Sequence, residues 1–69
     1  MWKKGTYKGY YIEAKVYDTP SSSGINNGRV SKLTVKANGN IVAHYDRGWD
    51  ERYITMGLIK EIVKAVCAA

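Results

Sequence analysis

The chain has 69 residues, of which 45% are hydrophobic and 25% are charged, and a formal net charge of +5. This length suits one small domain, residues 1–69, and the composition is that of a folded globular protein rather than a disordered one. One cysteine, Cys67, and one histidine, His44, exclude an internal disulfide framework and a metal cluster of these residues, so we expect no metal and no cofactor.

The chain shows no signal for a membrane. Its apolar runs fall short of the ~18 residues that a membrane-spanning helix needs. The charged start of the chain, Met1–Lys4, is not followed by the apolar segment of a secretory signal. We therefore expect a cytoplasmic protein with no membrane partner.

The positive charge is concentrated in the first part of the chain. Residues 1–40 hold seven lysines and arginines against two carboxylates, whereas residues 41–69 hold four against four. Such an asymmetry indicates an anionic partner. The alternative is that the lysines only keep a small sheet soluble and its edges unpaired.

Residues 2–7 and 10–18 are predicted to form a β-hairpin that turns at Lys8-Gly9, where glycine tolerates the positive φ angle of a tight turn. In this register Trp2 lies opposite Lys15, close enough for a cation–π contact. Apolar side chains alternate with polar ones along the second strand, so one face is expected to be buried and the other solvated. The residues of the buried face are Ile12, Ala14 and Val16.

Residues 18–28 are rich in turn-forming residues and too long for a tight hairpin. Loops of this length are usually either mobile or functional. Ile25 is the only aliphatic residue in the segment. We expect a protruding, flexible loop.

Residues 29–36 and 40–46 alternate in the same way and are predicted to form a second hairpin around Asn38-Gly39, the strongest turn signal in the chain. Two registers are open. A two-residue turn places Leu33 and Val35 beside residues 42 and 44. A three-residue loop with a glycine bulge places them beside residues 41, 43 and 45, and we prefer it because it buries more apolar side chain and leaves His44 beside Lys32 on the solvated face.

Residues 51–67 are predicted to form an amphipathic helix. Asp50 is the preferred N-cap, with Trp49 packing on Ile54 as a hydrophobic staple, and Thr55 is a competing cap because Gly57 weakens the first turns. One broad arc of the helical wheel is apolar. Its members are Ile54, Leu58, Ile59, Ile62, Val63, Val66 and Cys67.

These elements predict an α+β fold, a small antiparallel β-meander of three to four strands packed against one carboxy-terminal helix. Carboxylates and His44 do not occur at spacings that imply general acid–base catalysis, and Cys67 lies on the apolar face of the helix. We therefore expect a binding module and not an enzyme, with no catalytic residues.

Basic and aromatic side chains interleave on the predicted solvated face of the sheet. Such a face can contact phosphates and stack on bases, which makes nucleic acid the first candidate partner. The alternative is a protein partner or a homodimer, bound at the apolar margin of the helix. The predicted nucleic-acid-binding residues are Trp2, Lys4, Tyr11, Lys15, Tyr17, Lys32, Lys36, His44 and Arg47.

Two resemblances bear on this reading. The predicted architecture resembles the arm-binding domains of phage-type integrases and the plant GCC-box-binding domain, which implies a sheet laid in the DNA major groove. Four motifs, Trp-Lys-Lys-Gly at 2–5, Ala-Lys-Val-Tyr-Asp at 14–18, Gly-Arg-Val-Ser-Lys-Leu at 28–33 and Tyr-Asp-Arg-Gly-Trp-Asp at 45–50, resemble a family of small phage and prophage proteins of uncharacterised function. That resemblance implies a phage or prophage origin and no particular activity.

Overall fold

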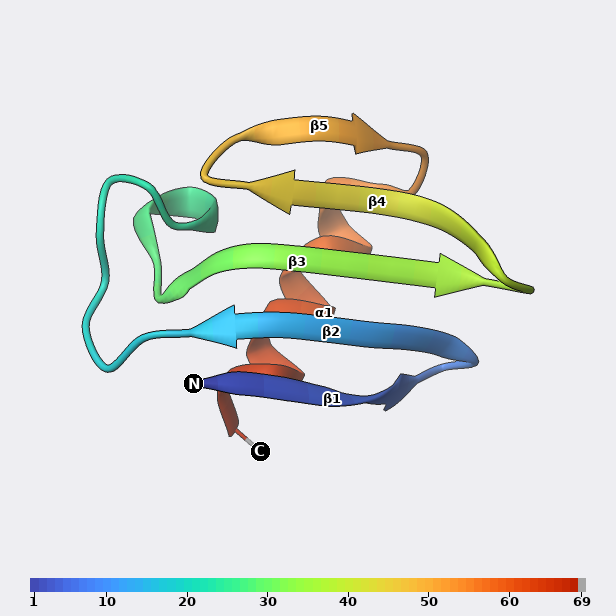
Figure 1. The fold of residues 1–69 in the computed structure, drawn as a ribbon, viewed down its shortest axis with the longest axis horizontal. Coiled ribbons are helices and arrows are strands. Elements are labelled where there is room, and N and C mark those ends of the chain that lie inside the picture. Colours follow the sequence, from blue (N-terminus) through green and yellow to red (C-terminus); the bar gives the residue numbers. More distant parts are fainter. Residues whose placement is uncertain (69) are drawn as a thin grey trace.

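The computed structural model describes residues 1–68 as one antiparallel sheet with a single α-helix on one face (Figure 1). The strands follow one another across the sheet in chain order, so the topology is a plain meander. The α+β class is thus confirmed, but there are five strands rather than three to four. They are β1 (Trp2–Tyr7), β2 (Tyr10–Val16), β3 (Val30–Ala37), β4 (Asn40–Asp46) and β5 (Trp49–Arg52), and the helix is α1 (Met56–Ala68).

The first hairpin has the predicted register. Lys8 and Gly9 adopt φ angles of 49° and 84°, which match a tight two-residue turn between β1 and β2. Trp2 pairs with Lys15, and its ring centroid lies 5.9 Å from the Lys15 Nζ. β2 ends at Val16, two residues earlier than predicted.

The second hairpin combines the two predicted registers. Asn38 and Gly39 form a two-residue turn with φ angles of 52° and 80°. An irregularity in the pairing between Val35 and Lys36 then shifts the register, so that Leu33 still meets Tyr45. Two details of the preferred register are wrong: Ile41 is exposed on the solvated face, and His44 lies opposite Thr34, because Asp46 is the partner of Lys32.

The predicted start of the helix is wrong. The segment Trp49–Arg52 pairs with β4 as a fifth strand, because Trp49 can pack edge-on against the Tyr45 ring at 5.0 Å between centroids. Asp50 therefore does not cap a helix, and Trp49 is no staple for Ile54. The competing cap is correct: the Thr55 Oγ1 accepts a hydrogen bond of 3.2 Å from the Leu58 backbone N–H.

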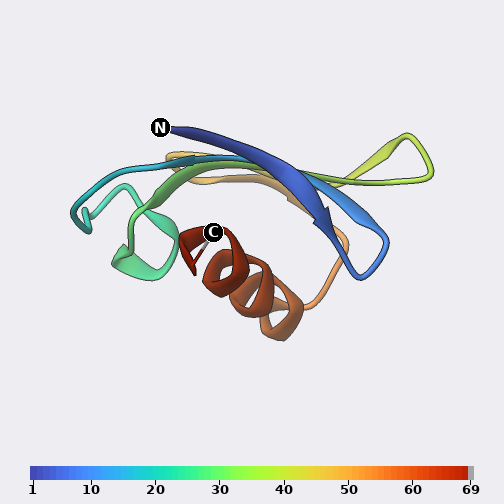
Figure 2. The ribbon, with the colours of Figure 1, turned by 90° about the horizontal axis from the view of Figure 1, so that it is seen from below.

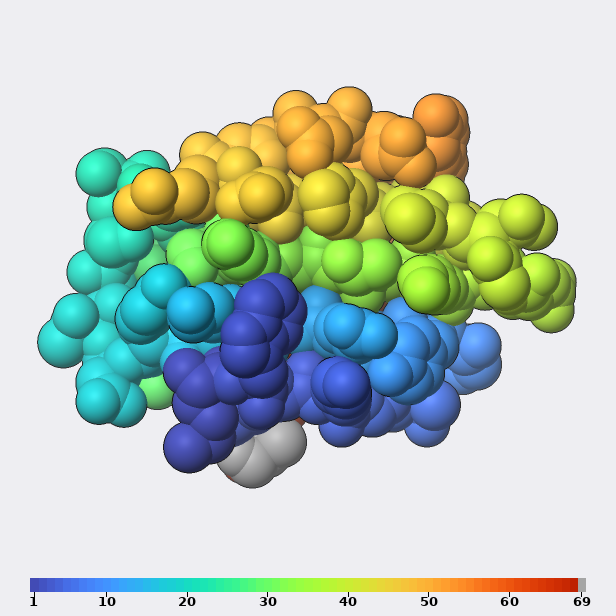
Figure 3. All heavy atoms as spheres, viewed as in Figure 1, coloured from blue at the N-terminus to red at the C-terminus, as the bar shows by residue number. Residues whose placement is uncertain are grey.

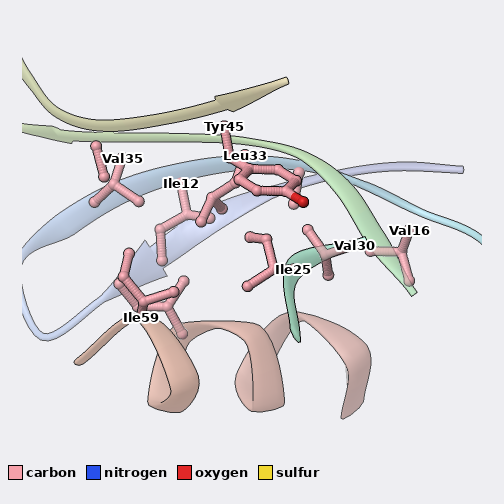
Figure 4. Close-up of a cluster of buried hydrophobic side chains, with 11 residues drawn as sticks. Ile12, Val16, Ile25, Val30, Leu33, Val35, Tyr45 and Ile59 are labelled. Carbon is pink, nitrogen blue, oxygen red and sulfur yellow. The ribbon is translucent and has the colours of Figure 1, made fainter. Parts of the chain in front are cut away.

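The core lies between the sheet and a layer made by α1 and the loop 17–29, which share one side of the sheet (Figure 2). Ile59 and Ile62 are the helix residues that are fully buried. The loop contributes Ile25, which is 3% exposed and reaches into the space between sheet and helix beside Val30 (Figure 4). The second half of the loop is therefore packed on the core, contrary to our expectation, whereas residues 17–22 are exposed.

The same loop is held together by its own backbone. Ser21 N–H donates to the Gly28 carbonyl at 3.0 Å, and Asn27 N–H donates to the Gly24 carbonyl at 3.0 Å. A Cβ atom added to Gly24 would lie 2.0 Å from the Gly28 carbonyl oxygen. The two glycines thus allow a close backbone approach that no larger residue at position 24 permits.

Three of the cations in residues 1–40 serve the helix. Lys3 Nζ donates to the Val66 carbonyl at 3.0 Å, and Arg29 donates to the Cys67 carbonyl at 3.3 Å, so both meet the negative end of the helix dipole. Lys8 Nζ contacts the Glu61 carboxylate at 2.8 Å. These three charges are therefore directed away from the solvated face of the sheet. Within residues 1–68, no helix has the length and apolar character to cross a bilayer.

We expect Gly24→Ala to lower the free energy of unfolding by roughly 1–3 kcal/mol, because the added methyl group must displace the Gly28 backbone. Chemical denaturation monitored by circular dichroism measures this loss. Gly48→Ala is the matched control, since a Cβ at Gly48 meets no atom within 4 Å. Equal stabilities of the two variants would contradict the close packing of the loop.

The contact between Lys8 and Glu61 predicts an acid-sensitive contribution to stability. A hydrogen bond from the Lys8 ammonium, and then one from the Tyr7 hydroxyl, lower the pKa of Glu61. The stabilisation is therefore present above the ordinary pKa of glutamate and is lost as the pH falls through the lowered pKa. We expect Glu61→Gln to be less stable than the wild type near neutral pH and equally stable once Glu61 is protonated.

Urea denaturation of both proteins across this pH range measures the difference. In a Lys8→Gln background the substitution of Glu61 should have a smaller effect, since the ammonium group that chiefly lowers the pKa of Glu61 is gone. A difference between wild type and Glu61→Gln that does not change with pH would rule out this ion pair as its source.

Candidate nucleic-acid interface

The face of the sheet opposite the helix is covered by polar and aromatic side chains, and Figure 3 views the molecule from this side. We call it the outer face. The strand registers arrange its residues in rows that cross the sheet. The first row is Trp2, Lys15, Lys32 and Asp46; the second is Lys4, Glu13, Thr34, His44 and Glu51; the third is Thr6, Tyr11, Lys36 and Ile41.

Eight of the nine predicted binding residues lie on the outer face, and the charge on this face is unevenly divided. Its lysines come from β1, β2 and β3, where Glu13 is the opposing carboxylate. The β4–β5 side adds Asp46, Asp50 and Glu51. The sequence prediction missed this acidic border, because it assigned Asp50 and Glu51 to the helix. We call the β1–β3 part of the outer face the basic strip.

The aromatic rings of the basic strip are accessible. Trp2 is 53% exposed, Tyr17 is 46% exposed and Tyr11 is 37% exposed. The Lys15 Nζ lies between two of them, 5.9 Å from the Trp2 ring centroid and 5.4 Å from the Tyr17 ring centroid. The dark-blue atoms at the start of the chain rise over the neighbouring strands in Figure 3, so the strip is not flat.

Two lysines stand directly opposite each other in the strip. Lys15 of β2 pairs with Lys32 of β3, at the positions where two side chains of a sheet lie closest. Like charges in such a pair destabilise a sheet. Lys32 has a carboxylate, that of Asp46, at 3.9 Å, which is a long contact between two side chains that are each at least 40% exposed. Lys15 and Lys32, which we call the Lys15–Lys32 doublet, can therefore both still bind an external anion.

Arg47, the ninth predicted residue, lies at a corner of the outer face in the β4–β5 turn. Its backbone N–H donates to the Ser31 carbonyl at 2.9 Å. Arg47 adopts a φ angle of 59°, a left-handed conformation, although Gly48 stands next to it. Among the described residues no ion pair joins Arg47 to Asp46, and the Asp46 carboxylate faces Lys32.

This corner is hollow. A pocket of about 360 Å³ opens where the end of β2, the following loop, the start of β3 and the β4–β5 turn meet, and Figure 3 shows these segments gathered at one end of the face. Sequence reasoning missed most of its lining, because hydroxyl residues in a loop carry no periodic signal. The lining residues are Tyr17, Thr19, Ser21, Ser23, Ser31 and Arg47.

Ser31 is the buried member of this lining, at 4% exposure. Its Oγ has no hydrogen-bond partner of adequate geometry within residues 1–68. The Ser31 hydroxyl nevertheless lies close enough to the Tyr17 phenol to act on it as a weak hydrogen-bond partner: this contact, and then one from the Lys15 ammonium, lower the pKa of Tyr17. The pocket thus favours negative charge at its phenol.

Other reactive side chains have structural partners or stand apart. His44 Nδ1 donates to the Asp50 carboxylate at 2.7 Å, which fastens β5 to β4 on the outer face. Cys67 is partly buried against the core. Among residues 1–68, no group of three or more histidine, cysteine or acidic side chains is placed to hold a metal ion. The outer face and its corner pocket are therefore the surfaces for which a function must be sought.

The chain can be assigned to a family at this point. The sequence model of a family described as a domain of unknown function, DUF7678, matches residues 1–69. The match spans the whole sequence, and the chain therefore belongs to this family. No curated protein and no solved structure matches it. The motif resemblance was to a family of uncharacterised function, and a family described as a domain of unknown function agrees with it in this respect.

We expect Ser31→Ala to leave the free energy of unfolding unchanged or to raise it by about 1 kcal/mol, because a buried hydroxyl that lacks a hydrogen bond of full geometry costs stability. The substitution should also raise the pKa of Tyr17 towards its ordinary value, which NMR of the tyrosine ring carbons can follow. Thr55→Ala is the contrasting variant: its hydroxyl caps the helix, so we expect a loss of about 1 kcal/mol. A comparable loss in Ser31→Ala would show that the Ser31 hydroxyl has a structural role.

Proposed function

We propose that the protein is a nucleic-acid-binding module whose basic strip contacts the phosphate backbone and whose exposed rings contact bases. The observation that carries this proposal is the Lys15–Lys32 doublet, two like charges held opposite each other and flanked by accessible aromatic rings. A polyanion relieves their mutual repulsion on binding. Lys4 and Lys36 extend the same charge along the strip.

The fold supports the proposal that lysines of the basic strip contact phosphates and that its rings contact bases. Lys3, Lys8 and Arg29 are engaged with the helix, so the lysines that remain on the basic strip are the ones with the freedom to contact a ligand. The acidic border on β4 and β5 repels phosphates and would confine a strand of nucleic acid to β1–β3. Because Trp2, Tyr11 and Tyr17 can stack only on unpaired bases, we expect single strands to bind more tightly than duplexes.

Three broader expectations go with this proposal. We propose that the protein acts by binding rather than by catalysis; the histidine–carboxylate pair of the outer face, His44 and Asp50, fastens β5 to β4. A phage or prophage origin and a cytoplasmic location stay predictions from the sequence. The predicted use of a sheet resembles the groove-binding sheets named above, although the sheet here has five strands.

Self-association through the helix margin also stays a prediction. The apolar residues of α1 that are not fully buried pack against the core as partly buried side chains, including Leu58, Val63 and Val66. The large hydrophobic residues that are most exposed lie elsewhere in the chain. The structure thus offers the outer face, rather than the helix, as the better-exposed surface for a partner.

The proposal is tested by fluorescence anisotropy with labelled single-stranded and duplex DNA over a range of salt concentrations. We expect micromolar binding of single strands whose affinity falls as salt rises, with a log–log slope of about −0.7 for each phosphate contact. The double variant Lys15→Gln/Lys32→Gln should shallow this slope by roughly one to two units. Absence of salt-dependent binding by the wild type would sink the proposal.

A second double variant controls for net charge. Lys60 and Lys64 are exposed on α1, on the opposite side of the molecule from the strip, so Lys60→Gln/Lys64→Gln removes the same charge at a distance. We expect this variant to bind much as the wild type does. If both double variants lose affinity equally, binding follows net charge and not the basic strip.

A further inference from the structure

The two edge strands of the sheet differ in how well they can accept another strand. β5 has four residues, and its pairing with β4 is interrupted by an irregularity between His44 and Tyr45. β1 has six residues in unbroken register with β2. Short and irregular edges resist further pairing, whereas a longer regular edge is a template for it. Within residues 1–68, β1 is therefore the edge at which the sheet can be extended.

The backbone of β1 presents a regular row of polar groups to this edge. Met1 and Val16 exchange two hydrogen bonds of 2.8 Å, which makes them a hydrogen-bonded pair of the ladder. Such pairs alternate with non-hydrogen-bonded pairs along antiparallel strands. The N–H and C=O groups of Trp2, Lys4 and Thr6 therefore point away from β2, towards the open edge. An added strand can form two hydrogen bonds with each of these three residues.

A hollow lies beside this edge at Gly5, on the helix side of the sheet. Its volume is about 110 Å³, and a Cβ atom added to Gly5 would meet no atom within 4 Å. The last turn of α1 emerges beyond β1 in Figure 1, and Ala65 and Val66 of this turn line the hollow together with Ile12. In an added antiparallel strand, the residue opposite Gly5 shares its face of the sheet. Its side chain would therefore enter the hollow, where these three residues offer apolar contacts.

Charge decides which kind of strand fits this edge. Residues 1–9 hold three lysines and no carboxylate, so two copies of β1 placed side by side would repel each other. Lys3 and Lys8 are engaged with the helix, whereas Lys4 is exposed on the outer face. A carboxylate directly opposite Lys4 forms a favourable cross-strand pair. The edge therefore favours an acidic strand of another protein over a second copy of this chain.

We infer that the β1 edge binds an extended peptide segment of a protein partner as a sixth, antiparallel strand of the sheet. The segment has an aliphatic residue opposite Gly5, followed by an acidic residue opposite Lys4. In this mode of recognition, main-chain hydrogen bonds supply affinity and a pocket for an alternate side chain supplies specificity. The inference goes beyond nucleic-acid binding by the basic strip and does not depend on it.

The test is a titration of the full chain with the acetylated and amidated peptide Thr-Thr-Val-Glu-Thr-Thr, followed by amide NMR. We expect saturable shifts with a Kd of about 0.1–1 mM. They should be largest at the amides of Trp2, Lys4 and Thr6, which gain hydrogen bonds. A peptide with glycine in place of the valine should bind roughly tenfold more weakly, because it leaves the hollow empty. A peptide with lysine in place of the glutamate should bind roughly threefold more weakly or worse.

Two N-methylated peptides separate strand pairing from other kinds of binding. In the proposed register the glutamate N–H donates to the Lys4 carbonyl, so its methylation should lower the affinity by roughly tenfold or more. The valine N–H points away from β1, and its methylation should change the affinity by less than about threefold. Equal affinities of the two methylated peptides would show that the peptide does not bind as a strand.

Two variants of the protein test the hollow and the charge. Gly5→Val fills the hollow from within, and the strand accommodates it because a Cβ there is unobstructed, so we expect a folded protein that binds the valine peptide roughly tenfold more weakly. Lys4→Glu should reverse the preference and bind the lysine peptide more tightly than the glutamate peptide. Lys36→Glu is the matched control, because it makes the same change of charge two strands away, on β3, and should bind as the wild type does.

Three results would overturn the inference. They are the absence of saturable shifts in the wild type, undiminished binding by Gly5→Val, and an unchanged peptide preference in Lys4→Glu. Since no nucleic acid is present in these titrations, such a failure would leave the proposal for the basic strip intact.

Discussion

A single short helix has to close one face of a five-stranded sheet, and most of the structure follows from this constraint. Neighbouring strands lie about 4.8 Å apart, so the sheet is roughly 20 Å wide, whereas a helix with its side chains is about 10 Å across. Ile59 and Ile62 are fully buried between the helix and the sheet. The remaining corner is closed by Ile25, and the loop that carries it must therefore be compact. Its tight backbone, with Gly24 against Gly28, is the consequence.

The same constraint divides the charges of the chain between two surfaces. One helix on one face leaves carbonyl groups at its carboxy-terminal end that need cations, and Lys3 of β1 and Arg29, just before β3, meet them. The net charge therefore overstates what the outer face presents. On that face the addition of β5 places carboxylates next to the lysines of β1–β3, so the basic strip is narrower than the composition indicates, and more sharply bounded. Its Lys15–Lys32 doublet is the part of the sheet that packing does not explain.

The corner pocket arises where the closing loop returns to the outer face. Its side chains come from the end of β2, the loop, the start of β3 and the β4–β5 turn, and they meet only because the loop is drawn in by Ile25. In this lining Ser31 is buried beside the Tyr17 phenol, and Arg47 is an exposed residue of the β4–β5 turn.

The sequence by itself determined the features that depend on neighbours along the chain. These are the first hairpin with its register, the alternation of solvent-facing and core-facing side chains in β2 and β3, and the apolar arc of the helix. The lysines and rings of the outer face belong to them as well. Only the tertiary structure decided the fifth strand, because Asp50 and Glu51 favour a helix start locally and lose that preference to pairing with β4 and to the Trp49–Tyr45 contact. It also decided the position of the pairing shift, between Val35 and Lys36, and the pocket. Both join residues that are distant in the chain, and side-chain periodicity carries no information about such contacts.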